Sequence, residues 1–373
     1  MLNPLDDYPI HQTPEPLAQT VSGDRNHYDR FWFNGYDATG SVYFGAALGV
    51  YPNREVMDGA FSVVHDGVQT SVHASRRAPA DRTQCTVGPL SVRVDEPLRR
   101  LTITVGPNEA DVSASLTFTA RTAACEEPRF TRRTPAGRVV MDYTRLTQFG
   151  SWAGWISVGG TRIEVSPDLV VGTRDRSWGV RPVGERETGA PGGLPQFFWL
   201  WAPVNFDDVA THFDVQEDGE GRRWHHNGVV LPVIGPADPV VDGGTPMADA
   251  SWSIAWRPGT RRASSARVTL TPFDAAPHVI ELEPILDFQM SGLGYFHPEW
   301  SHGVWKGAEA VGVESAKLAD LDPMAIPNIH VQQLCRATMG SRVGTGILES
   351  LIIGPHVPSG FTSILDPAPL PAE

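Results

Sequence analysis

The sequence predicts an all-β protein built from two consecutive, similar antiparallel β-barrels with few short helices. Three observations support this fold class: one stretch recurs later in the chain, many short segments alternate apolar and polar residues, and 37 glycines and 32 prolines are spread along the chain. Short alternating segments bounded by turn residues are typical of sandwiches and barrels. A length of 373 residues suits two such domains better than one.

The repeat has a constant offset of 152 residues, from Phe61 to Phe213, and needs no gap. Each copy alternates apolar residues and then reaches an Asp-Gly turn, which is typical of a β-hairpin. The matched pairs are Phe61 with Phe213, Val63 with Val215, Asp66 with Asp218, Gly67 with Gly219, Asn53 with Asn205 and His73 with His225. A duplicated unit creates a seam between two similar halves, and small ligands often bind at such boundaries.

Residues 1–30 are polar and proline-rich, and we expect them to form an N-terminal arm. Strand-like alternation runs through 31–183, the expected first barrel, and resumes in 197–373, the expected second barrel. Between them, 184–196 is rich in glycine, proline and charge and is the expected linker.

Within the first range, Gly159-Gly160 predicts the two-residue turn of a hairpin over 152–165. The other strand-like segments of this range are 31–37, 41–51, 59–75, 90–94, 100–105 and 113–121. Those of the second range are 197–204, 210–219, 251–258, 266–273, 278–288 and 344–355. Their regular spacing predicts antiparallel sheets joined by short turns.

The formal net charge of −13 argues against nucleic acid and anionic membranes as partners, because such a surface repels phosphate groups. The three cysteines show no CxxC spacing and predict neither a disulfide framework nor a zinc site. The N-terminal segment lacks the apolar core of a signal peptide, and no apolar run approaches the length of a membrane-spanning helix. We therefore expect a cytoplasmic protein; the sequence does not indicate its oligomeric state.

Eleven tryptophans, several of them clustered, predict a large aromatic cavity for a hydrophobic small molecule. Core packing is the ordinary explanation for any single one. Trp199 and Trp201 share one face of a strand, because side chains two residues apart point the same way. The candidate substrate-binding residues are Trp152, Trp178, Trp199, Trp201, Trp300, Trp305 and Arg176.

The segment GTRDRSWGVRP (172–182) places Asp175 between Arg174 and Arg176, with Trp178 close behind. One interpretation is an inter-domain salt-bridge clip. The other is a catalytic acid beside an aromatic wall, because burial raises the pKa of a carboxyl group and makes it a usable proton donor. Arginines that point at the carboxylate would lower its pKa instead, so the direction of the two flanking side chains decides between these roles.

The segment GYFHPEWSHG (294–303) contains Tyr295, His297 and His302. These side chains suit proton transfer or the polarisation of a carbonyl, and we take them, with Asp175, as the candidate catalytic residues. Structural histidines are the competing interpretation. We expect no metal here, because a proline interrupts the spacing and no third ligand is evident.

Other polar residues have less specific interpretations. His225-His226 lie next to a turn and are expected to be exposed, whereas His212 and Asp214 share a strand face that is either solvent or barrel interior. Asp287 follows a strand-like run and is a candidate to point into the second barrel. No nucleotide loop, nucleophile elbow or HExxH motif is present, so we expect no cofactor.

Asp175-Arg176-Ser177-Trp178-Gly179 resembles the Asp-His-x-Trp-Gly motif of the carotenoid 1,2-hydratase / AttH-like superfamily, which includes lipocalin-like cyclases. This resemblance implies two consecutive lipocalin-like β-barrels with the motif near their junction. The blocks FWFNGYDATGSVYFGAALGVYPNR, TRDRSWGVRP and GYFHPEWSHGVWKG are most similar to an uncharacterised bacterial branch. Arg176 replaces the motif's histidine and stays protonated, so only Asp175 and Trp178 carry over as candidates.

Together these features predict a cofactor-independent enzyme acting on an isoprenoid or polycyclic substrate. The reaction would be an acid-assisted hydration, dehydration, isomerisation or cyclisation, of the lyase or isomerase type. Tryptophan faces would stabilise a cationic intermediate by roughly 0.5–2 kcal/mol each. The alternative is a non-catalytic carrier for a lipid, steroid or terpenoid.

Overall fold

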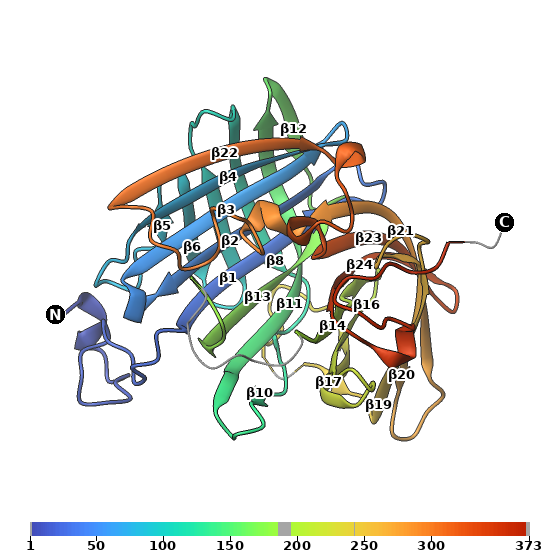
Figure 1. The fold of residues 1–373 in the computed structure, drawn as a ribbon. Coiled ribbons are helices and arrows are strands. Elements are labelled where there is room, and N and C mark those ends of the chain that lie inside the picture. Colours follow the sequence, from blue (N-terminus) through green and yellow to red (C-terminus); the bar gives the residue numbers. More distant parts are fainter. Residues whose placement is uncertain (1, 186–194, 242, 371–373) are drawn as a thin grey trace.

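The computed structural model describes residues 2–185, 195–241 and 243–370, and it is almost entirely β (Figure 1). The first sheet runs from edge to edge through β22 (Glu309–Lys317), β4 (Val68–Arg77), β3 (Val56–His65), β2 (Tyr43–Tyr51), β1 (His27–Tyr36), β13 (Val171–Val180), β11 (Val139–Val158), β8 (Val112–Ala120), β7 (Arg100–Val105), β6 (Leu90–Glu96) and β5 (Thr86–Val87). Three further strands pair with β11: β9 (Cys125–Glu126), β10 (Phe130–Arg133) and β12 (Thr161–Val165).

The second sheet runs through β18 (Thr245–Pro246), β17 (Arg223–Pro232), β16 (Val209–Glu217), β14 (Phe197–Trp201), β24 (Arg342–Ile353), β23 (Val331–Met339), β21 (His278–Gln289), β20 (Ala263–Thr271) and β19 (Asp249–Trp256). The short strand β15 (Val204–Asn205) pairs with β16 and β24. The helices are single 3₁₀ turns: η1 (Pro4–Asp7), η2 (Pro52–Arg54), η3 (Met290–Leu293), η4 (Leu318–Asp320), η5 (Ile326–Asn328) and η6 (Val357–Ser359). The prediction of an all-β, lipocalin-like double barrel is confirmed.

The repeated residues occupy equivalent hairpins. Phe61 is buried in the core of the first unit on β3, and Phe213 is buried in the core of the second on β16. The first hairpin turns at Asp66-Gly67, both with positive φ. Alternation decides which side chains meet, because successive residues of a strand point to opposite faces. The repeat therefore reflects two similar hairpins, each of which buries its apolar face in a separate core.

A third apolar cluster lies at the seam between the two sheets. On β1, Phe31 and Phe33 belong to the first core, whereas Trp32 points the other way into the seam. On β14, Leu200 belongs to the second core and Trp199 to the seam. The two sheets thus present apolar outer faces to each other.

Strand β22 comes from the range expected to form the second barrel but pairs with β4 at the edge of the first sheet (Figure 1). The turn η3, which precedes it in the chain, also packs on β2, β3 and β4. Most of the expected linker at 184–196 lies outside the described residues. No helix of the described part of the chain is long and apolar enough to cross a membrane.

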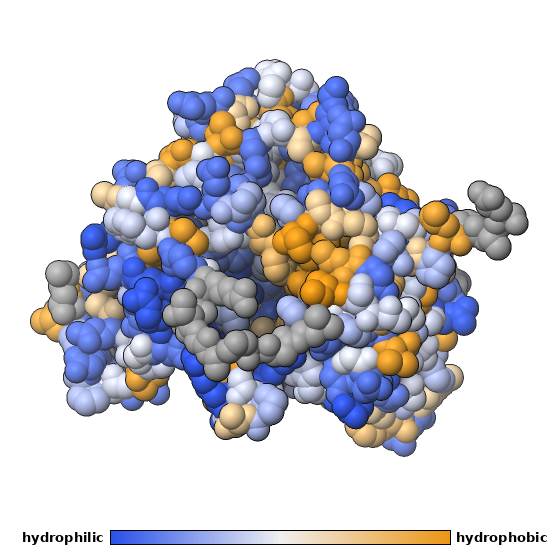
Figure 2. Space-filling model, viewed as in Figure 1, coloured by the Kyte–Doolittle hydropathy of each residue, from blue (hydrophilic) through white to orange (hydrophobic). Residues whose placement is uncertain are grey.

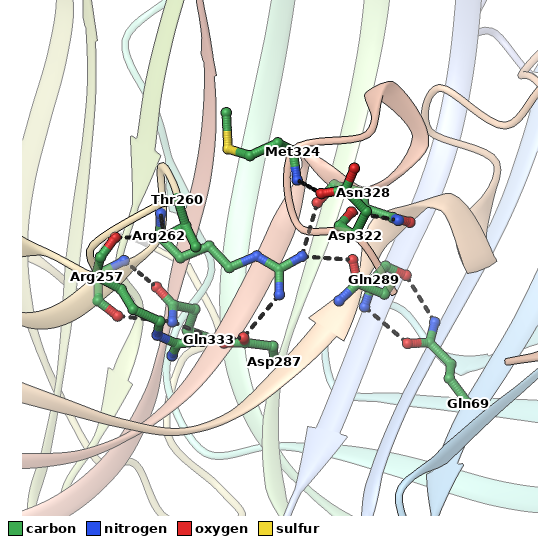
Figure 3. Close-up of polar contacts among 11 residues, drawn as sticks. Gln69, Arg257, Thr260, Arg262, Asp287, Gln289, Asp322, Met324, Asn328 and Gln333 are labelled. Carbon is green, nitrogen blue, oxygen red and sulfur yellow. Dashed lines mark hydrogen bonds and ion pairs between the residues drawn. The ribbon is translucent and has the colours of Figure 1, made fainter. Parts of the chain in front are cut away.

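Asp287 forms part of a polar network near the seam (Figure 3). Its carboxylate accepts hydrogen bonds from Arg257 and Arg262, both at 2.9 Å. Close by, the Gln69 amide on β4 donates to the Gln289 carbonyl and accepts from its N–H, each at 2.8 Å (Figure 3). Asp287 is thus engaged in ion pairs, while Gln69 and Gln289 connect the two sheets.

Candidate functional site

A cavity of about 400 Å³ lies at the seam between the two units. The surface is hollowed in this region, and an apolar patch lies beside the hollow (Figure 2). The lining comes from β1, β11 and β13 of the first sheet, from β14, β16 and β24 of the second, and from the segments around Tyr295 and His330. The lining residues are Trp32, Met141, Tyr143, Arg145, Asp175, Arg181, Pro182, Phe197, Trp199, Trp201, Gln216, Tyr295, Phe296, His330, Glu349, Leu351 and Ile353.

Tryptophans from both units form an aromatic wall of this cavity. The rings of Trp32 and Trp201 meet edge to face with centroids 5.5 Å apart. Trp199 lies two residues before Trp201 on β14, and its Nε1 donates to the Glu349 carboxylate at 3.0 Å. Because i and i+2 share a strand face, the placement of one of these β14 tryptophans in the seam brings the other there too.

Asp175 points into the cavity from the middle of β13, where its backbone lies between Trp32 of β1 and Thr147 of β11. Its carboxylate makes no hydrogen bond or ion pair within the described part of the chain. Burial raises the pKa of Asp175 to about 6, against the opposing effect of the Arg145 and Arg30 charges. A carboxyl group with such a pKa carries its proton below about pH 6 and lies close enough to neutral pH to exchange it during a reaction.

The arginines that flank Asp175 in sequence point away from it. Arg174 is buried on the other face of β13, where its Nε donates to Gln148 at 2.9 Å. Arg176 pairs with Asp29 at 2.7 Å and lies over the ring of Phe31. Alternation on the strand separates both guanidinium groups from the carboxylate.

Tyr295 lines the cavity and is connected to two residues behind it, the buried Arg30 and the partly buried His302. Arg30 Nη1 donates to Tyr295 Oη at 2.8 Å and lies 3.4 Å from His302 Nδ1. Burial, together with the Arg30 and Arg181 charges, holds the pKa of His302 well below its usual range. The neutral ring donates from Nε2 to the Leu293 carbonyl, so both of its nitrogens are engaged. The hydroxyl proton of Tyr295 remains available to a ligand, because its oxygen is the acceptor for Arg30.

His330 and Glu349 form a second polar group in the cavity wall, which the sequence did not indicate as functional. His330 Nε2 lies 2.8 Å from Glu349 Oε1. Burial acts to raise the pKa of Glu349, but hydrogen bonds from His330, Gln332 and Trp199 outweigh it and hold the pKa below its ordinary value. One signal was present: Glu349 is a carboxylate inside the apolar run GTGILESLIIGP.

Arg145 is clamped between carboxylates and aromatic rings. Its Nε donates to Glu127 at 2.7 Å, and its guanidinium lies 4.8 Å from the ring centroids of Phe130 and Trp199. Behind it, Asp214 contacts His212 at 2.8 Å and His225 at 2.6 Å. The expectation that His225 is exposed was wrong: it lies on β17, is 5% exposed and stacks on Phe130.

Among the described residues, two groups have the spacing of metal ligands: Glu127, Asp214 and His225, and separately His73, His297 and Glu314. In the first, the Arg145 cation already pairs with Glu127. In the second, His297 Nδ1 accepts backbone N–H bonds from Glu299 and Trp300, so Nε2 carries the proton and donates to Glu314. A ligating histidine has the opposite arrangement, with the free nitrogen on the metal. Neither group therefore fits a metal well.

The structure brings Asp175, Tyr295, Trp199 and Trp201 together at the cavity and places the other predicted site residues elsewhere. Trp152 is buried in the first core, where its Nε1 donates to the Asn34 carbonyl. Four more residues do not reach the cavity because they lie on other faces: Trp178 and Trp305 are exposed, Trp300 stacks on His73, and His297 pairs with Glu314. Arg176 and His302 do not line the cavity either: Arg176 pairs with Asp29, and His302 contacts Arg30 and the Leu293 carbonyl.

Comparison with known proteins extends this picture. A family model described as "Family of unknown function (DUF8625)" matches residues 2–362. An AttH candidate from Nitrosomonas europaea has a similar fold, with a TM-score of 0.51 and 14% identity over 87% of this chain and 92% of that chain. Kievitone hydratase from Nectria haematococca also has a TM-score of 0.51, with 12% identity over 87% and 88% of the two chains. A comparison with curated protein sequences finds no match.

Proposed function

The chain belongs to the DUF8625 family, and we propose that it is an acid–base enzyme of the lyase or isomerase type that acts on a hydrophobic substrate in the seam cavity. The observation that carries this proposal is Asp175: a carboxyl group with a pKa of about 6 and no partner within the described chain, facing an aromatic cavity. A carrier has no use for such an acid, whose burial costs stability. The shared fold with a hydratase supports the same reaction class.

In this proposal Asp175 is the general acid and the His330–Glu349 pair is the second proton-handling group. In a hydration, Asp175 gives its proton to one carbon of an alkene while water adds its oxygen to the neighbouring carbon. The added water loses a proton to His330, which Glu349 orients. His330 then releases this proton to solvent, and solvent protonates Asp175 again. Such general acid–base steps contribute roughly 10²–10⁴-fold to the rate.

Tyr295 donates its hydroxyl hydrogen bond to a substrate oxygen, and Arg30 and His302 position it from behind. The tryptophan wall holds the apolar body of an isoprenoid or polycyclic substrate, which lowers the entropic barrier to reaction. We propose that the chain represents a bacterial branch of the AttH-like superfamily, located in the cytoplasm, in which Asp175 works without the motif histidine that Arg176 replaces.

The test is to identify what the cavity binds and what becomes of it. Native mass spectrometry of the purified protein against a panel of terpenoids, steroids and polyphenols would find the ligand, and product analysis would follow its conversion. We expect turnover that falls at least about a hundredfold in Asp175→Asn. Recovery of every bound ligand chemically unchanged, by the wild type as well as by the variant, would contradict the enzyme and support a carrier.

A further inference from the structure

The charge distribution around the cavity is unusual because two arginines, the buried Arg30 and the partly buried Arg181, form no ion pair with a carboxylate in the described part of the chain. Arg30 is 1% exposed, and within the described residues its side chain hydrogen-bonds only to Tyr295 and His302, both neutral acceptors in this arrangement. The carboxylates of Asp58 and Asp175 act on its charge through space but form no hydrogen bond or ion pair with it. The Nε and Nη2 atoms of Arg30 have no hydrogen-bond partner in the part of the chain that the structure describes.

Arg181 shows the same deficit at the cavity wall itself. It follows β13, lies 4.6 Å from the ring centroid of Tyr28 and 5.9 Å from that of Tyr295, and lines the cavity. Its side chain forms no hydrogen bond or ion pair within the described ranges, and its Nε is buried without a partner. Aromatic rings hold the guanidinium in place but do not neutralise it.

Arg145 shows what a compensated arginine looks like in the same cavity. Glu127 pairs with it directly, and Asp214 lies 3.9 Å away. A buried charge without such a partner is destabilising, and proteins ordinarily pair or neutralise it. The chain therefore provides a counter-ion for one cavity arginine and leaves the other open to a ligand.

We propose that the natural ligand carries an anionic oxygen group, a carboxylate or phenolate, which Arg181 binds beside the Tyr295 hydroxyl. This inference rests on the proposed function and names its substrate class: an aromatic or polycyclic acid rather than a neutral hydrocarbon. The apolar body of the ligand lies on Trp199, Trp201 and Trp32, and Arg30 is a positioning residue that acts through Tyr295. The positive charges of Arg30 and Arg181 would stabilise negative charge that builds up on the substrate oxygen. They would disfavour the cationic intermediate that we expected from the sequence.

The test compares two fluorescent probes with the same ring system, 8-anilinonaphthalene-1-sulfonate and the neutral N-phenyl-1-naphthylamine. The net charge of −13 repels anions from the surface as a whole, so preference for the sulfonate requires a local cation. We expect the wild type to bind the anionic probe about 10- to 100-fold more tightly, as for a charge-assisted hydrogen bond. This ratio needs no variant and so does not depend on whether one folds.

Arg181→Gln should lower the affinity for the anionic probe at least about tenfold and change the affinity for the neutral probe by no more than about twofold. Arg181→Lys should retain part of the preference for the anionic probe. The matched control is Arg267→Gln, because Arg267 is an exposed arginine paired with Glu281 on the second sheet. Equal affinity for both probes, or a preference that survives in Arg181→Gln, would overturn the proposal.

The outcome is separable from the proposed function. Asp175→Asn should keep the preference for the anion or increase it, because it removes a neighbouring negative charge, while it abolishes turnover. If the preference for the anion is absent but turnover still depends on Asp175, only the proposed anionic substrate class is overturned. An intact preference with no turnover of any bound ligand would overturn only the proposed enzyme, and failure to bind either probe would overturn the anion site.

Discussion

Replacing Asp175 by Asn should stabilise the protein at neutral pH, although it removes the proposed catalytic acid. The native pKa of about 6 lies above the value of 3.8 for a free aspartate, so the folded state holds a proton that the unfolded chain has released. Stability of the wild type therefore falls as pH rises from about 4 to about 6 and is flat above that range. Asn carries no charge and escapes this loss.

The magnitude follows from the size of the shift. About two pKa units at roughly 1.4 kcal/mol each give an upper bound of about 3 kcal/mol. Solvent reaches the carboxyl group through the cavity, and we therefore expect Asp175→Asn to gain about 1–2 kcal/mol at pH 7 and almost nothing at pH 4.

The assay is urea denaturation of both proteins between pH 4 and 8, with Asp274→Asn as the control for an exposed aspartate. The difference between Asp175→Asn and the wild type should grow through the window from pH 4 to 6 and then stay constant. A difference that is independent of pH, or a variant that loses stability at pH 7, would refute a buried, unpartnered acid at this position.

Four further substitutions affect the cavity wall, the first core, the Arg145 ion pair and an exposed tryptophan. Trp199→Leu should weaken probe binding at least about tenfold, measured by fluorescence titration. Unchanged affinity would contradict the proposal that Trp199 forms part of the binding surface. Trp152→Ala should cost about 3–5 kcal/mol of unfolding free energy in urea without changing probe specificity, because it opens a hole in the first core. Glu127→Ala should cost about 3–5 kcal/mol by leaving the buried Arg145 without its hydrogen-bonded counter-ion and with only Asp214, 3.9 Å away, and a neutral effect would contradict this role of Glu127. Trp178→Ala should change stability by less than about 0.5 kcal/mol, since its ring is exposed.

Local pattern predicted much of the fold. The hairpin turning at Gly159-Gly160 joins β11 to β12 with both glycines at positive φ. The repeated Phe61 and Phe213 proved to lie in equivalent hairpins. Both results depend on neighbours in sequence, through side-chain alternation and turn chemistry.

The placement of β22 depends on a contact that local pattern does not contain. Its partner is β4, so that Glu314 lies opposite Ser71, more than 200 residues earlier in the chain. The alternation of 309–317 is compatible with any sheet edge. The packing of η3 on the first sheet brings the chain to this edge, and the sequence pattern does not show that contact.

In the candidate site, too, some features follow from local sequence and others depend on contacts between distant segments. Alternation separates Asp175 from Arg174 and Arg176, and this could be read from the sequence once the segment was taken as a strand. The sequence did not reveal which face of β13 meets the cavity, nor that Arg30 and Arg181 converge on Tyr295 from far along the chain. Tryptophans look alike in sequence, whether they are buried like Trp152 or line the seam.

The most direct measurement is the incorporation of deuterium into the bound ligand. The ligand recovered by native mass spectrometry is incubated with the wild type and with Asp175→Asn in deuterated water, and carbon-bound deuterium is determined by mass spectrometry and NMR. Proton transfer to carbon by Asp175 predicts one solvent deuteron per turnover at a single carbon with the wild type, faster below pH 6, and at least about a hundredfold less with the variant. A ligand that returns without deuterium from the wild type, or with equal label from both proteins, would contradict Asp175 as the acid of this cavity.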